Sequence, residues 1–138
     1  MTRSLALCLL ISLAAAPVAR SEAVPAKEAR QVIEQQLSAF ERDDAAGAYS
    51  YAAPELQAQF PDPDLFLYMV ANHYPAVHRH RSVEFGPVAE KDGAVAETVI
   101  FTDGDGRVWN ALYTLEKQPE GAWKISSCVL ARSDQVAL

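Results

Sequence analysis

Residues 90–121 read EKDGAVAETVIFTDGDGRVWNALYTLEKQPEG, and this stretch decides the fold. Apolar and polar residues alternate around three turn sequences, EKDG, TDGDG and QPEG. Alternation with a period of two is typical of strands, and glycine favours a tight reversal because it adopts positive φ without a steric penalty. Connections this short join antiparallel neighbours, since parallel strands need long crossovers. The stretch therefore predicts an antiparallel meander.

The alternation extends in both directions from this stretch. It predicts four strands, over Val77–Val88, Ala94–Thr102, Arg107–Lys117 and Trp123–Arg132. These strands are longer than the average of about five or six residues, and Gly86-Pro87 suits a β-bulge. Long strands in a small sheet twist and curl, so we expect a curved sheet that can enclose a pocket.

Helical periodicity precedes the strands. An amphipathic helix is predicted over Ala26–Arg42 and a shorter one over Ala45–Ala52, with a further short helix or turn from Pro54. Asp62 and Pro63 begin another helix, which Pro75 ends because proline has no N–H to donate. Helices followed by one antiparallel sheet indicate an α+β domain, with the N-terminal helices packed on one face of a curved four-stranded sheet.

The N-terminus is typical of a secretory signal peptide. Arg3 precedes the apolar run LALCLLISLAAA over residues 5–16, and small residues follow it. We expect cleavage after Ala23, with cleavage after Ala19 as the alternative. Cleavage after Ala23 leaves a single domain over residues 24–138, in the periplasm or outside the cell. The alternative is an N-terminal helix that stays attached.

Charge and cysteine content exclude some classes of binding partner and an internal disulfide. Removal of residues 1–23 takes away two arginines and one glutamate, so the mature chain carries a net charge of −7. This acidity argues against binding to nucleic acid or to anionic membranes. No second apolar run is long enough to span a membrane. Only Cys128 remains, so the mature chain forms no intramolecular disulfide.

Several runs resemble a known family. They are AFERDDAAGAYSYAAPELQAQFPDPDLFLYMV at 39–70, YPAV at 74–77, DGDGRVWNALYTL at 103–115 and EGAWKISSCVL at 120–130. The chain resembles the bacterial domain-of-unknown-function family 4864, within the cone-shaped superfamily of nuclear transport factor two (NTF2-like) and ketosteroid isomerase. The resemblance implies helices in the mouth of a curved sheet, often around a pocket. It implies no activity, because this superfamily includes isomerases, dehydratases and proteins that only bind.

Isomerases of that superfamily use an aspartate base and a tyrosine or protonated carboxyl donor in an apolar pocket. The chain has five candidate tyrosines, which are Tyr49, Tyr51, Tyr68, Tyr74 and Tyr113. Its clustered acids are explained by helix capping and turn formation: Asp43, Asp44, Asp62, Asp103 and Asp105. No catalytic residue is therefore predicted. A lyase or isomerase is the alternative to a binding protein, and a module that dimerises through its open sheet face is a third reading.

The HRH sequence at residues 78–80 raises the question of a metal or anion site. On a strand, Arg79 and Arg81 share a face with Val83 and Phe85, while His78 and His80 face solvent. We expect an arginine at the pocket rim, bound to an internal carboxylate or to a ligand carboxylate. A bulge before Val83 would reverse these faces. No metal or cofactor is predicted, because two histidines with Glu84 make an incomplete ligand set and DGDG lacks most calcium ligands.

The leading hypothesis is an exported domain that binds a small ligand or a protein partner without catalysis. The predicted ligand-binding residues are Arg79 and Arg81 at the rim and Tyr49, Tyr113 and Trp109 in the wall. Alternation places Trp109, Ala111, Tyr113 and Leu115 on one strand face, and Trp123, Ile125, Ser127 and Val129 on another. Cys128 is predicted to be a buried, inert thiol, or a thiol that cross-links two chains.

Overall fold

A computed structural model describes residues 24–133, so the predicted leader over residues 1–23 lies outside the described residues. The helices are α1 Val24–Glu41, α2 Ala45–Ser50, α3 Pro54–Gln57, α4 Pro63–His73 and α5 Pro75–His78. The strands are β1 Ser82–Lys91, β2 Ala94–Thr102, β3 Val108–Lys117 and β4 Trp123–Arg132. Within this part of the chain, no helix combines the length and apolarity that crossing a membrane requires.

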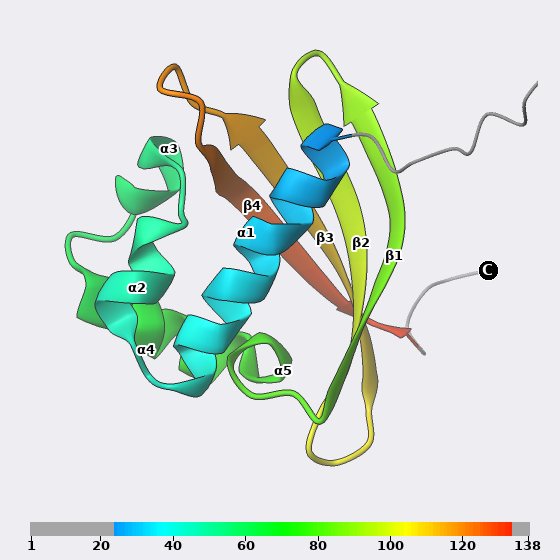
Figure 1. The fold of residues 1–138 in the computed structure, drawn as a ribbon. Helices are drawn as coiled ribbons and strands as arrows, with labels where there is room; N and C mark the ends of the chain where they lie inside the picture. Colours follow the sequence, from blue (N-terminus) through cyan, green and yellow to red (C-terminus); the bar gives the residue numbers. More distant parts are fainter. Residues whose placement is uncertain (1–23, 134–138) are drawn as a thin grey trace, which may run out of the picture.

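The strands form one antiparallel sheet in the order β1-β2-β3-β4. Figure 1 shows the sheet as a curved layer with the helices on one side of it and α1 lying across it. The predicted α+β architecture is confirmed. It follows from the turns, because each short reversal places the next strand beside the one before.

Two aspartates begin helices as the sequence predicts. The Asp44 side chain accepts a hydrogen bond from the Gly47 N–H at 3.0 Å, and Asp62 accepts one from the Leu65 N–H at 2.9 Å. Each carboxylate satisfies an N–H that has no partner inside the first turn of its helix. These caps fix where α2 and α4 begin.

The prediction of a first strand over Val77–Val88 is wrong at its start, because β1 begins at Ser82 and residues 75–78 form the short helix α5. Pro75 ends α4 as expected, but it also occupies the first position of α5. Proline suits that position because its fixed φ matches a helix and its missing N–H would be unpaired there. Arg79 and Arg81 therefore lie outside the strand whose alternation assigned them to the core face.

Two irregularities shape the sheet. The register of β1 against β2 shifts between Phe85 and Val88, at the Gly86-Pro87 position where a bulge was predicted. A second shift was not predicted: Thr114 pairs with Ser127 and Leu115 with Ile125, so Ser126 has no partner in β3. An extra residue of this kind reverses which side chains face inward along the rest of its strand.

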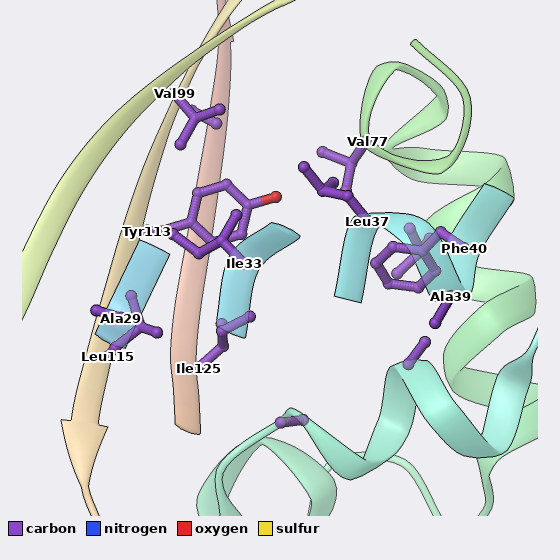
Figure 2. Packing of buried hydrophobic residues seen from close by; sticks show 14 of the residues in the cluster. Ala29, Ile33, Leu37, Ala39, Phe40, Val77, Val99, Tyr113, Leu115 and Ile125 are labelled. Atoms are coloured by element: carbon purple, nitrogen blue, oxygen red, sulfur yellow. The ribbon is translucent and has the colours of Figure 1, made fainter. Parts of the chain in front are cut away.

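The core lies between α1 and the concave face of the sheet. Figure 2 shows Ile33 of α1 close to Tyr113, Leu115 and Ile125 of the sheet, with Phe40 farther along α1 toward the other helices. All five side chains are almost fully buried. The α1 residues, which recur at helical spacing, and the strand residues, which alternate along each strand, thus pack into one hydrophobic cluster.

Candidate functional site

A cavity of about 290 Å³ lies between the helical layer and strands β3 and β4. Its volume is at the lower end of the range of about 300–1,000 Å³ that is usual for small-molecule sites. Most of its wall is apolar. The lining residues are Gln36, Phe40, Leu56, Gln59, Phe60, Phe66, Met69, Val70, Tyr74, Val77, Tyr113, Ile125, Ser126, Ser127 and Cys128.

The helical wall of the cavity is built on α4. Phe66, Met69 and Val70 follow one another at spacings of three and one, and all three line the cavity. Phe66 also stacks edge-on against Phe60, with ring centroids 5.6 Å apart. Aromatic pairs prefer such tilted arrangements, so these rings make a defined apolar surface at the helical end of the cavity.

The strand wall depends on the unpredicted bulge at Ser126. Before the bulge, Trp123 and Ile125 are buried. After it, Cys128 lines the cavity and Val129 is exposed. The prediction that Val129 shares the inward face of Trp123 and Ile125 is wrong, because the extra residue reverses the alternation. Cys128 is instead the residue directly opposite Tyr113 in the pairing of β3 with β4.

Tyr113 and Cys128 are the two ionisable side chains of the strand wall. Burial raises the pKa of Tyr113 well above its ordinary value, and the neighbouring Cys128 adds to the shift. Burial also raises the pKa of Cys128 to about 12, with the Tyr113 hydroxyl acting in the opposite direction. Both side chains are therefore neutral near pH 7. The thiol cannot act as a thiolate nucleophile there, because the thiolate is almost absent about five units below its pKa.

Gln36 and Tyr49 fix the helices around the cavity. Gln36, which is buried and lines the cavity, donates from Nε2 to the Ala48 carbonyl at 3.1 Å. The Tyr49 hydroxyl lies 3.1 Å from the Gln57 carbonyl and 2.9 Å from the Phe60 carbonyl. Tyr49 thus anchors the segment from α3 to Phe60. It was predicted to line the cavity wall, and it supports that wall without lining it.

The predicted site residues do not converge. Tyr113 lines the cavity, whereas Tyr49 stands behind its wall and Trp109, at the start of β3, bonds to Asp103 of the neighbouring turn. Arg79 and Arg81 are exposed and are absent from the lining. Arg79 donates to Asp43 Oδ2 at 2.6 Å, and Arg81 donates to the Gly104 carbonyl at 2.6 Å. The prediction of an arginine at the pocket rim assumed that residues 79–81 belong to a strand, and β1 begins only at Ser82.

The HRH sequence instead contacts the acidic end of α1. His78 Nε2 lies 2.7 Å from Asp43 Oδ1, and His80 Nε2 lies 3.4 Å from Glu41 Oε1. The hydrogen bond to His78 lowers the pKa of Asp43, while burial lowers the pKa of His80. Among residues 24–133, no group of three or more His, Cys, Asp and Glu side chains is arranged to hold a metal ion.

The DGDG sequence forms the predicted turn. Asp103 is buried, and its Oδ1 accepts from the backbone N–H groups of Asp105 and Arg107, each at 2.9 Å. Its Oδ2 accepts from Trp109 Nε1 at 2.9 Å, and this bond is the main cause of the lowered pKa of Asp103. The carboxylate therefore stabilises a hairpin, and Trp109 takes part in that turn.

Comparison with known proteins identifies the family and the fold. The sequence model of a family described as "Domain of unknown function (DUF4864)" matches residues 22–138. A search of curated proteins gives no significant match. Solved structures are more informative about the fold, and three of them show how far the likeness extends.

An NTF2-like protein of unknown function from Silicibacter pomeroyi is 17% identical, covers 78% of this chain and 95% of its own, and gives a TM-score of 0.54. The protein Aln2 from a Streptomyces species is 19% identical, with 84% and 96% covered and a TM-score of 0.56. A ketosteroid isomerase-like protein from Erwinia carotovora is 12% identical, with 78% and 95% covered and a TM-score of 0.55. At these identities the likeness establishes an NTF2-like fold and no activity.

Proposed function

We propose that this chain, which belongs to the family described as "Domain of unknown function (DUF4864)", binds a small ligand in the cavity between its helices and its sheet. The observation that carries the proposal is the cavity itself, with its apolar wall and a few hydroxyl, amide and thiol groups. Concave apolar sites with a few polar groups are the usual form of small-molecule sites.

Binding without catalysis is favoured over an isomerase or lyase. None of the described residues that line the cavity is Asp, Glu, His, Lys or Arg. General acid–base catalysis needs a group whose pKa lies near the working pH and which reaches the substrate. The buried phenol and thiol have raised pKa values and stay protonated, so neither serves as a base.

We further propose that binding takes place in the periplasm or outside the cell, since residues 1–23 have the features of a signal peptide. N-terminal sequencing of protein from the exported fraction tests this. A first residue near Val24 supports export with cleavage, whereas an intact Met1 there contradicts it.

A tryptophan at position 69 should block the cavity. Met69 lines it from α4, and the larger indole would occupy space that the ligand needs. Ethylbenzene, acetophenone and benzoate serve as small aromatic probes, and saturation-transfer NMR measures their binding. For each probe that binds the parent, we expect Met69→Trp to weaken the affinity about tenfold or more, which corresponds to ~1.4 kcal/mol of binding free energy.

Tyr68→Trp is the matched control for that substitution. Tyr68 is the preceding residue of α4 and is exposed, so the same indole there leaves the cavity unchanged. Chemical denaturation of both variants separates blocked binding from lost folding. Equal probe binding by the parent, Met69→Trp and Tyr68→Trp would place the bound probes outside the cavity and contradict the proposal.

A second candidate function is self-association through the outer sheet face. Leu112 and Val129 are directly paired across β3 and β4, yet they are 47% and 62% exposed. Leu112 also pairs with Thr98 on its other side, so its cross-strand neighbours are uncharged. Two copies of an acidic chain repel least where such uncharged surfaces meet, and a two-fold contact places the same patch on both copies.

Leu112→Lys should convert such a dimer to a monomer, because it places like charges opposite one another at the contact. Light scattering coupled to size-exclusion chromatography measures the mass. Leu65→Lys on α4 is the control, since Leu65 is similarly exposed but lies away from the sheet. A parent protein that is monomeric at all accessible concentrations would reject this second function and leave the cavity proposal intact.

A further inference from the structure

Three arginines lie at the end of the sheet where the TDGDG turn joins β2 to β3. Arg81 donates from its guanidinium to the Gly104 carbonyl of this turn at 2.6 Å. Arg107 follows the turn, and Arg132 is the residue of β4 that pairs with Trp109 at the start of β3. Figure 1 shows the turn, in yellow, at the same end of the sheet as the last residues of β4. This end therefore concentrates guanidinium groups.

Two of these arginines line a pocket of about 310 Å³, called the arginine pocket below. The described residues that line it are Arg107, Val108, Arg132 and Ser133. It shares none of them with the cavity between the helices and the sheet, so the two sites are separate. The arginine pocket combines two positive side chains and a hydroxyl with an apolar side chain, because Val108 is 40% exposed.

The Arg132 side chain is held against the neighbouring strand. Its guanidinium carbon lies over the Trp109 ring, 6.0 Å from the ring centre. The indole is itself fixed, because its Nε1 donates to Asp103 Oδ2 at 2.9 Å. A planar guanidinium stacks well on an aromatic face, and a side chain held in this way loses less conformational freedom when it binds an anion. Arg132 is therefore positioned before a ligand arrives.

Arg107 is fixed at its backbone and accessible at its side chain. Its N–H donates to Asp103 Oδ1 at 2.9 Å, which sets the point from which the side chain extends. The side chain is 54% exposed, and its Nη1 donates to Asp105 Oδ2 at 3.3 Å. The Asp105 side chain is 76% exposed, and an ion pair in water is weak. A more highly charged anion can therefore replace Asp105 as the partner of Arg107.

The donors of the arginine pocket match a phosphate group. A guanidinium holds a carboxylate or a phosphate through two parallel hydrogen bonds. Two guanidiniums share one phosphate monoester more readily than one carboxylate, because the monoester has three acceptor oxygens and about 1.5 to 2 negative charges at pH 7. The acidity of the rest of the chain opposes this only weakly, since charges farther apart than about 8 Å are largely screened at physiological ionic strength.

We propose that Arg107, Arg132 and Ser133 bind the phosphate group of a small molecule, either inorganic phosphate or an organic phosphate ester. The two guanidiniums hold the phosphate oxygens, and Val108 contacts the group that an ester carries. The inference goes beyond the proposed function, because it assigns a second site apart from the cavity. Arg81 does not line this site and has a supporting role, since it donates to the turn that precedes Arg107.

Isothermal titration of the full chain with inorganic phosphate, phenyl phosphate and benzoate tests the inference. The titration is done at about pH 8, where phosphate is a dianion because its second pKa is about 6. We expect both phosphates to bind more tightly than benzoate. Arg107→Gln and Arg132→Gln should each weaken the binding of phosphate about tenfold or more, as the loss of a hydrogen bond to a charged group does.

Arg42→Gln is the matched control for Arg107→Gln. The Arg42 side chain is 60% exposed and lies 3.5 Å from the exposed carboxylate of Asp44, so the substitution removes the same charge from a similar pair. Arg42 is not among the residues that line the arginine pocket. We expect its loss to leave the phosphate affinity unchanged. Equal weakening by Arg42→Gln and Arg107→Gln would show an effect of net charge alone and contradict the inference.

Asp105→Asn should change the affinity in the opposite direction. It removes the carboxylate that competes with the ligand for Arg107 and leaves the backbone N–H of Asp105, which donates to Asp103, in place. We expect phosphate to bind about twofold to fivefold more tightly, the range that an exposed ion pair accounts for. Weaker or unchanged binding by this variant contradicts the placement of the phosphate beside Arg107.

A readout without any variant is the ¹H–¹⁵N spectrum, in which the amide signals of Arg107, Val108 and Ser133 should shift when phosphate is added. Tighter binding of phenyl phosphate indicates an ester as the ligand, and equal or tighter binding of inorganic phosphate indicates the free ion; each supports the site. If neither phosphate shifts these signals, or if benzoate shifts them at a lower concentration than phenyl phosphate, the inference is overturned. That result leaves the cavity proposal intact, because Met69→Trp tests different residues.

Discussion

Replacing Trp123 with alanine should lower the free energy of unfolding by about 3–5 kcal/mol, as truncation of a buried aromatic residue usually does. Trp123 begins β4, is only 8% exposed and belongs to the hydrophobic core. Its Nε1 also donates to Glu28 Oε2 of α1 at 2.9 Å, so the side chain joins the sheet to the first helix. Urea denaturation followed by circular dichroism measures the loss.

Trp123→Phe separates the two contributions. It keeps most of the apolar surface and removes the indole N–H, so the hydrogen-bond part of the loss should be about 1 kcal/mol. If Trp123→Ala unfolded within about 0.5 kcal/mol of the parent, as surface substitutions do, the assignment of Trp123 to the core would be wrong.

Replacing Arg30 with methionine should cost about 3 kcal/mol, at the lower end of the range for breaking a buried ion pair. Glu97 of β2 is 0% exposed, and Arg30 Nε donates to its Oε1 at 2.8 Å. The Arg30 guanidinium also lies 5.2 Å from the centre of the Phe85 ring, over its face. Loss of the guanidinium leaves the buried carboxylate without this donor, whereas methionine preserves much of the apolar stem.

The double variant Arg30→Met, Glu97→Met identifies the cause of that loss. Replacing both members of a buried pair with apolar residues is often neutral, so we expect most of the stability to return. Stability measured by urea denaturation at pH 7 gives the coupling between the two positions. A double variant no more stable than Arg30→Met would show that packing of the arginine stem, and not the charge pair, explains the loss.

The turns made most of the fold predictable. EKDG, TDGDG and QPEG each force a reversal, and their spacing fixes the order of β2, β3 and β4. The first strand was less predictable, because Pro75 can both end one helix and begin another. Alternation of apolar and polar residues from Val77 onward was therefore compatible with a strand, although tertiary packing places residues 75–78 in a helix.

The site was predicted less well than the fold. Strict alternation through β4 assigned Val129 to the inward face, and the two adjacent serines at positions 126 and 127 were the sequence signal that this alternation is interrupted. In β2 the same alternation places Glu97 on one face with Val95 and Val99. The burial of this carboxylate was therefore predictable from the sequence. Its partner on α1 lies 67 residues away in sequence, and no local pattern identifies it.

The cavity likewise depends on segments distant in sequence. Gln36, Met69 and Cys128 line it from α1, α4 and β4, and they meet only because the sheet curves around the helices. Local periodicity predicts that each element has an inward face. It does not predict which inward side chains leave a space between them, because that depends on how the layers pack.

A crystal structure of the chain soaked with 4′-bromoacetophenone tests the central claim most directly. The account predicts an anomalous bromine peak inside the cavity, among Phe60, Met69 and Cys128. A cavity without bromine density at saturating ligand, or bromine bound only at the outer surface, would contradict it.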